Sequence, residues 1–141
     1  MEITTYDLRT PEAVFRESHD AFNRGDLDAF CALWAEDCEY RPAPEFSLEG
    51  PAAGYRGHEG LRVWWQRIHD DWDEVHSAIE QVRDLGDRCM GQIAFRGRGA
   101  ASGAAIEAHV VQVATVREGR IAQTHDYFDL DQAAQIEGLP T

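Results

Sequence analysis

The sequence has little positive charge and no long apolar run. Arginine and lysine together number 13 against 26 acidic residues, so the formal net charge of the 141-residue chain is −13. Nucleic acids and anionic membranes bind basic surfaces, which argues against both as partners. No stretch approaches the roughly 20 apolar residues that a membrane-spanning helix needs. The opening residues are polar and acidic, unlike a signal or transit peptide, so we expect a cytoplasmic protein.

Cysteine is also scarce, and the familiar motifs for metals and cofactors are missing. Cys31, Cys38 and Cys89 are odd in number and form no CxxC pair, which predicts buried free thiols in a reducing compartment. The six histidines show no HxH or HExxH spacing, so no metal site is predicted. The sequence contains no phosphate-binding loop, nucleophile elbow or dinucleotide fingerprint, and we expect no organic cofactor.

The composition that remains is that of a globular protein. Hydrophobic residues make up 43% of the chain and charged residues 28%, which is too apolar for a disordered protein. A length of 141 residues suits one hydrophobic core. With no internal repeat and no linker, residues 1–141 are predicted to form a single domain.

Helices are predicted first and strands afterwards, which is the α+β order. Thr10 and Pro11 are typical of a helix start and Gly25 of a helix end, and Asp26 is typical of the cap of a second, short helix. Apolar residues at helical spacing predict a third helix over residues 57–72. Strands are predicted over residues 38–42, 74–83, 88–96 and 104–129, with a loop at 43–56 that would form a lid or rim and a short helix at 131–139.

The stretch from Ala104 to Asp129 reads as two strands joined at Glu118-Gly119. If Arg117 lies opposite Arg120, side-chain alternation puts His109 and Asp126 on one face as diagonal neighbours. His125 then points to the opposite face.

This pairing is the strongest chemical signal in the chain. A carboxylate among apolar residues is expected to have a raised pKa, which suits Asp126 as a general base. His109 would orient it or donate to an oxyanion. The alternative from the residues alone is a structural His–Asp pair at the end of the sheet.

Both faces of the predicted hairpin are largely apolar. One face would cover the helices, and the other needs a second cover. A homodimer packed sheet to sheet would supply that cover, so we expect a homodimer.

Four segments carry a resemblance to a known group of proteins. The order of the elements around them resembles the NTF2-like superfamily, and within it the SnoaL-like and ketosteroid-isomerase-like proteins. The segments are AFNRGDLD at 21–28, WAED at 34–37, YRGHEGL at 55–61 and REGRIA at 117–122.

The resemblance implies a cone-shaped (cystatin-like) fold in which a curved antiparallel sheet wraps around N-terminal helices. It also implies an apolar pocket, a dimer, and chemistry without metal or cofactor, as in polyketide cyclases, isomerases, dehydratases and epoxide hydrolases. Asp126 matches the acid–base Asp that SnoaL-like cyclases carry on the last strand, and His109 is similar to their histidine on the preceding strand. The isomerase pattern fits poorly, because Tyr40, Ser18 and Val111 stand where its catalytic groups are expected.

The leading hypothesis is therefore a small enzyme acting on a hydrophobic, carbonyl-bearing molecule. Asp126 would remove a proton beside the carbonyl, and His109 with Ser18 or Tyr40 would stabilise the enolate. The pocket is predicted to be lined by Trp34, Trp65 and Phe128. One alternative is a non-catalytic protein that binds a small apolar ligand, and another is a structural dimerising module.

Overall fold

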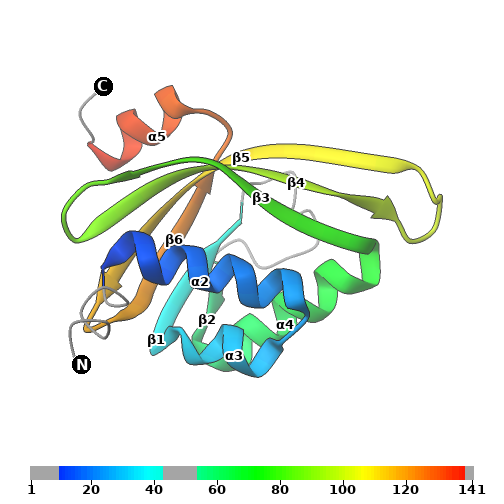
Figure 1. The fold of residues 1–141 in the computed structure, drawn as a ribbon, viewed down its shortest axis with the longest axis horizontal. Helices are drawn as coiled ribbons and strands as arrows, with labels where there is room; N and C mark the ends of the chain where they lie inside the picture. The colour runs from blue at the N-terminus through cyan, green and yellow to red at the C-terminus, as the bar shows by residue number, and fades with distance from the viewer. Residues whose placement is uncertain (1–9, 43–53, 139–141) are drawn as a thin grey trace.

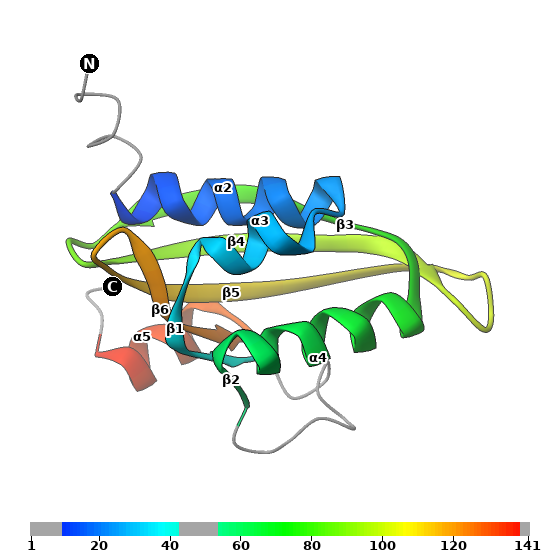
Figure 2. The same cartoon turned by 90° about the horizontal axis from the view of Figure 1, so that it is seen from below.

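The computed structural model describes residues 10–42 and 54–138 of the chain. Three helices lie on one side of a curved sheet and a fourth lies on the other side (Figures 1 and 2). None of the helices in these two ranges is both long and apolar enough to cross a membrane. The elements are α2 (Pro11–Arg24), α3 (Leu27–Ala32), β1 (Trp34–Arg41), β2 (Tyr55–Arg56), α4 (Gly57–Asp71), β3 (Trp72–Asp84), β4 (Arg88–Gly99), β5 (Ala105–Arg117), β6 (Arg120–Tyr127) and α5 (Leu130–Glu137).

The first helix begins and ends where its sequence signals predict. The Thr10 side chain accepts a hydrogen bond from the Ala13 amide at 3.2 Å, which satisfies one orphan donor of the first turn of α2. Gly25 ends the helix with a φ of 73°, a left-handed conformation that suits glycine. Asp26 caps α3 in the same way, through the Ala29 amide at 3.1 Å.

The six strands form one sheet in the order β2-β1-β6-β5-β4-β3. All neighbours are antiparallel except β1 and β6, which run parallel. Helices α2, α3 and α4 cover the inner face of this sheet, and α5 packs on the outer face of β5 and β6 (Figures 1 and 2). The α+β architecture with N-terminal helices against a curved sheet is therefore confirmed.

The first strand is longer than predicted. β1 begins at Trp34 rather than at Cys38, and it ends at Arg41, just before a proline that cannot donate to the ladder. The predicted loop at 43–56 lies outside the described residues over 43–53. Tyr55 and Arg56, which end that predicted loop, instead form β2, where Tyr55 pairs with Tyr40 of β1.

The register of the β5–β6 hairpin differs from the predicted one. Arg117 lies opposite Arg120 as expected, but Ala122 is an extra residue in β6, so Thr115 pairs with Gln123 and Gln112 pairs with Asp126. A β-bulge of this kind moves every later side chain to the other face of the sheet.

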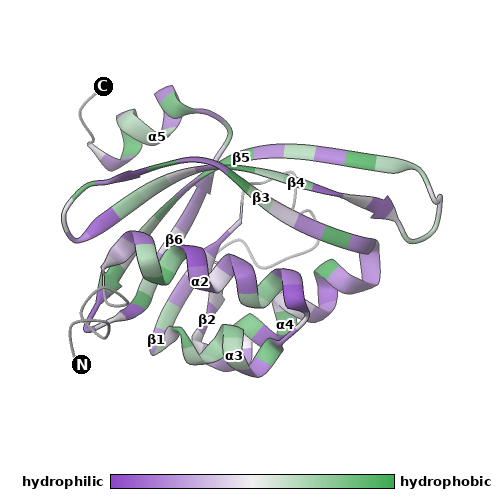
Figure 3. Ribbon diagram, viewed as in Figure 1, coloured by the Kyte–Doolittle hydropathy of each residue, from purple (hydrophilic) through white to green (hydrophobic). Residues whose placement is uncertain are grey.

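The core lies between the three helices and the inner face of the sheet. Hydrophobic and hydrophilic residues alternate along the strands, as Figure 3 shows for β4 and β5. A second, smaller cluster lies on the outer face, where Ala133 of α5 packs with Val111, Val113 and Tyr127. Part of the apolar outer face is thus covered by α5 of the same chain.

Candidate functional site

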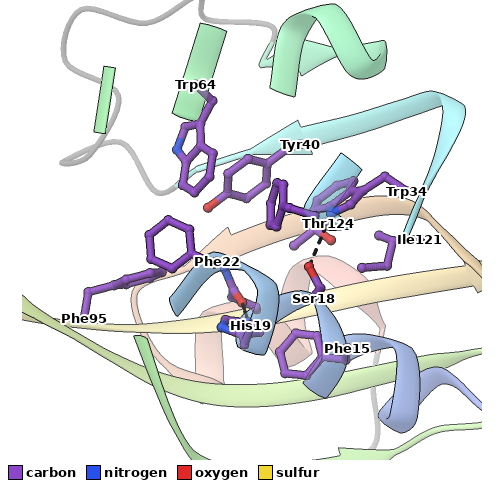
Figure 4. A pocket seen from close by; sticks show the side chains of 12 residues that line it. Phe15, Ser18, His19, Phe22, Trp34, Tyr40, Trp64, Phe95, Ile121 and Thr124 are labelled. Carbon is purple, nitrogen blue, oxygen red and sulfur yellow. Dashed lines mark hydrogen bonds between the residues drawn. The ribbon is translucent and has the colours of Figure 1, made fainter. Parts of the chain in front are cut away.

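A small cavity of about 30 Å³ lies between α2 and the inner face of the sheet. Side chains of α2 enter it from one side, and Tyr40 of β1 and Trp64 of α4 enter from the other (Figure 4). It is lined by Phe15, Ser18, His19, Phe22, Phe30, Trp34, Tyr40, Trp64, Phe95, Gln112, Ile121 and Thr124.

A second compartment adjoins this cavity and contains Asp126. Its lining shares Tyr40, Trp64 and Phe95 with the first compartment, and it continues to Ile68 and Trp72. Asp126 therefore reaches the same interior space as the aromatic side chains, from the last strand of the sheet.

Asp126 and Tyr40 form a buried pair. The Tyr40 hydroxyl donates a hydrogen bond to Asp126 Oδ2 at 2.7 Å, and the Asp126 residue is only 7% exposed. Burial, and next the negative charge of Asp126, raise the pKa of Tyr40 well above its ordinary value. Tyr40 therefore keeps its proton at neutral pH and presents it as a hydrogen-bond donor.

His19 forms a second polar group in the cavity. Its Nε2 lies 2.8 Å from Gln112 Oε1 and its Nδ1 lies 2.7 Å from Ser77 Oγ. Burial lowers the pKa of His19 to about 4, although the hydrogen bond to Gln112 opposes this shift. The imidazole is therefore neutral at pH 7.

Ser18 and Thr124 add two hydroxyl groups to the lining. Ser18 Oγ accepts a hydrogen bond from the Trp34 indole nitrogen at 3.3 Å, drawn as a dashed line in Figure 4. Because Ser18 accepts from Trp34, its own proton is available to a bound molecule. Thr124 is buried on β6, two residues before Asp126 and on the same face.

The predicted partnership between His109 and Asp126 is wrong in its geometry. The bulge at Ala122 puts Asp126 on the inner face, whereas His109 lies on the outer face with its side chain 56% exposed. There His109 contacts Glu107 at 2.7 Å and Glu80 at 3.6 Å.

The remaining predicted residues divide between the cavity and other places. Ser18, Trp34 and Tyr40 line the cavity. Phe128 does not, because it is 44% exposed and lies beside His109 in a groove on the outer face. Trp65 packs into the core against Phe22 and Phe30, with ring centroids 5.4 and 5.2 Å apart. Its neighbour on the helix, Trp64, faces the cavity instead.

His125 lies on the outer face, opposite to Asp126, as predicted. Its ring contacts Glu39 at 3.4 Å and Glu137 of α5 at 3.2 Å. The same Glu137 carboxylate accepts hydrogen bonds from Tyr127 and Arg88. These contacts hold α5 on the sheet and are separate from the cavity.

Two polar residues of the cavity were missed in the sequence. His19 lies four residues after Phe15 and three before Phe22, so helical spacing places it on the buried face of α2. Gln112 interrupts an apolar run of β5, and a buried amide in such a run needs a partner. Both signals were present, but their pairing needed the tertiary structure.

The described ranges contain no group of three or more His, Cys, Asp or Glu side chains that could hold a metal ion. The polar groups of the cavity are instead a carboxylate, a phenol, a neutral imidazole, an amide and two hydroxyls. This set can accept a proton, donate hydrogen bonds and surround an apolar molecule with aromatic rings.

Comparison with known proteins identifies one family and many solved structures with a similar fold. A family model described as a SnoaL-like domain matches residues 15–124. An NTF2-like protein of unknown function from Burkholderia pseudomallei is 22% identical, with a TM-score of 0.73 over 89% of this chain and 95% of that chain. A candidate polyketide cyclase from Xanthomonas campestris is also 22% identical, with a TM-score of 0.69 over 86% and 92% of the two chains.

A computationally designed binder of 17-OHP is 21% identical, with a TM-score of 0.72 over 84% of this chain and 90% of that chain. At these identities the likeness shows the shared fold. No curated protein matches the chain.

Proposed function

The chain belongs to the SnoaL-like domain family, and from that premise we propose that it transfers a proton within a small hydrophobic molecule that carries a carbonyl group. The observation that supports this proposal is the buried carboxyl of Asp126, which borders an aromatic cavity and accepts a hydrogen bond from Tyr40 at 2.7 Å. A carboxylate beside an apolar space has few competing water molecules and suits general base catalysis.

Asp126 would act as the base at the carbon next to the carbonyl group. The C–H bond breaks, its proton passes to a carboxyl oxygen of Asp126, and the electron pair moves to the carbonyl oxygen. Ser18 is the proposed donor to that oxygen, because its hydroxyl lies in the lining, whereas the proton of Tyr40 is donated to Asp126. Cyclisation, isomerisation and dehydration can all begin with this step, and the proposal requires no cofactor.

The test is the exchange of α-protons for deuterium in a bicyclic aromatic ketone such as 2-tetralone, followed by proton NMR in heavy water. Asp126→Asn keeps the size of the side chain but removes the base, so exchange above the buffer rate falls by a factor of about 100 or more. His109→Asn is the matched control, because His109 is exposed on the outer face, and it keeps the parent rate.

Two outcomes contradict the proposal. One is an Asp126→Asn variant that exchanges as fast as the parent protein. The other is a parent protein that binds bicyclic or tricyclic ketones, as measured by calorimetry, yet accelerates exchange in none of them.

A non-catalytic ligand carrier is the second candidate function. It is favoured by the internal hydrogen bonds of the cavity, since Tyr40 donates to Asp126 and both nitrogens of His19 have partners. A designed protein of this fold is described as a binder of 17-OHP. A carrier predicts ketone binding that is unchanged in Asp126→Asn and no exchange in either protein.

We also propose that two copies of the chain associate through the outer face of the sheet. Helix α5 covers only part of that face, and the neighbouring Phe128 and Leu130 are 44% and 42% exposed. Large apolar side chains next to an uncovered sheet favour a protein partner. The cytoplasm is the proposed location, because the three cysteines are buried free thiols, as suits a reducing compartment.

A further inference from the structure

Three aromatic side chains divide the interior space in two. Tyr40, Trp64 and Phe95 line both the larger compartment, which contains the Ser18 hydroxyl, and the smaller compartment, which contains Asp126. The rings of Trp64 and Tyr40 lie next to each other, with centroids 5.1 Å apart (Figure 4). A molecule that contacts both Ser18 and Asp126 must therefore pass between these three rings.

Neither compartment by itself is large enough for a bicyclic ketone. Their volumes are about 30 and 10 Å³, and a single water molecule already takes up roughly 10–15 Å³ of such a cavity. Because protein interiors are closely packed, the missing space has to come from the movement of a side chain in the wall. A ligand that occupies both compartments therefore displaces at least one of the three shared rings.

Two of these rings are held in place by contacts within the sheet and with α2. The Tyr40 hydroxyl donates a hydrogen bond to Asp126 at 2.7 Å, which a rotation of the ring would break. Phe95 belongs to β4, which pairs with a strand on each side, and its ring packs edge-on against Phe22 with centroids 6.2 Å apart. Displacement of either ring would disrupt contacts that a ketone cannot replace.

Trp64, which comes from α4, is held by packing alone. Its ring contacts Phe22, Phe30 and Tyr40, with centroids 5.6, 5.9 and 5.1 Å away. In the described ranges its indole nitrogen donates no hydrogen bond, whereas the indole of Trp34 donates one at 3.3 Å. An aromatic ring of a ligand can replace ring contacts of this kind, so Trp64 is the ring that a ligand displaces at the lowest cost.

We propose that Trp64 determines the size of the ligand that the interior accepts, because its ring closes the passage between the two compartments. A ligand that needs both compartments binds only the fraction of molecules in which this ring has moved, which weakens its apparent affinity. A smaller side chain at position 64 removes that requirement. The ketone class of the ligand rests on the proposed function, whereas the division of the interior does not.

The test measures the affinity for fluorenone by equilibrium dialysis. Fluorenone is a tricyclic aromatic ketone with no hydrogen on the carbons next to its carbonyl, so it can bind but cannot exchange. Trp64→Leu is expected to bind fluorenone at least about tenfold more tightly than the parent protein, because the passage is open. Trp64→Phe makes a smaller opening and gives a smaller gain, which keeps the test available if Trp64→Leu does not fold.

Trp65→Leu is the matched control, because it makes the same change at the next position of the same helix. Trp65 packs into the core against Phe22 and Phe30 and is not among the residues that line either compartment. This variant is expected to keep the parent affinity for fluorenone. Equal affinities in the parent and both Trp64 variants overturn the proposal, and so does an equal gain in Trp65→Leu, which would indicate a general loosening of the core.

Ketone exchange separates this proposal from the proposed function. If Asp126→Asn exchanges the protons of 2-tetralone as fast as the parent, the proposed function fails, while the fluorenone affinities still decide the role of Trp64. If Asp126→Asn is slow and the fluorenone affinities are equal, only the role of Trp64 is overturned.

Discussion

Tyr40 and Asp126 are 86 positions apart in the sequence and meet because β1 and β6 run side by side. Their hydrogen bond places a phenol between the carboxyl and the larger compartment of the cavity. The chemistry of the site therefore depends on one strand contact that no local pattern contains.

Replacing Tyr40 by phenylalanine tests this pair directly. The hydroxyl stabilises the carboxylate form of Asp126, so its loss moves the acidic limb of the pH–rate profile to higher pH. Exchange kinetics from pH 4 to 9 would check this shift, and an unchanged profile would show that Tyr40 is a lining residue without a chemical role.

The buried His19 makes the stability of the protein depend on pH. Its pKa is about 4 in the folded state and near 6.5 when exposed, so the unfolded chain binds more protons between these values. The free energy of unfolding therefore falls as the pH drops through this window, by about 2 kcal/mol from pH 7.5 to pH 5.

Urea denaturation at the two pH values, compared between the parent and His19→Gln, would measure this contribution. The variant has no titrating group at this position and loses less stability on acidification. An equal loss in both proteins would mean that other groups cause the acid sensitivity.

At the scale of elements, the packing of α2 on the sheet depends on a glycine in β4, because a larger residue there would clash with α2. A Cβ atom added to Gly91 of β4 would lie 2.7 Å from two ring atoms of Phe15. Phe15 is almost fully buried and lines the cavity, so its ring has little room to move.

Gly91→Ala is therefore expected to destabilise the fold by about 1–3 kcal/mol through overpacking. Phe15→Leu shortens the ring that causes the clash, so the double variant should lose less stability than the sum of the two single variants. Thermal or urea unfolding of the four proteins would measure this coupling. Strict additivity would contradict the contact.

The bulge at Ala122 is the second feature that belongs to the element scale. Side chains of β6 alternate between the two faces of the sheet both before and after the bulge. The extra residue shifts this alternation by one position, so the side chains after the bulge lie on the face opposite to the predicted one. The sequence reading assumed an uninterrupted ladder, and for that reason it placed Asp126 beside His109 instead of beside Gln112. Without the bulge the carboxyl would not reach the cavity.

At the scale of the whole molecule, the outer face of the sheet is the proposed site of self-association. The double variant Phe128→Ser, Leu130→Ser makes the exposed apolar edge polar, and we expect it to weaken the dimer by at least about tenfold. Val63→Ser is the matched control, because Val63 is an equally exposed apolar residue on α4, on the other side of the sheet. Sedimentation equilibrium at micromolar concentrations would compare the three proteins, and a monomeric parent would contradict the proposal.

The sequence by itself determined most of the helices and strands, and the family. The signals that predicted the helices are local, because each depends on residues within one or two helical turns. They are the caps at Thr10 and Asp26, the left-handed Gly25 and the spacing of apolar residues. The same reading identified Asp126 and the lining positions Ser18, Trp34 and Tyr40.

Only the tertiary structure decided which polar groups meet. The bulge at Ala122 arises where β6 pairs with its neighbours, and it moved Asp126 to the inner face and away from His109. His19 and Gln112 are 93 positions apart, and their contact requires α2 to lie across the inner face of the sheet. Local patterns predict the face of an element, but the partner on that face is determined by how strands and helices pack over long distances.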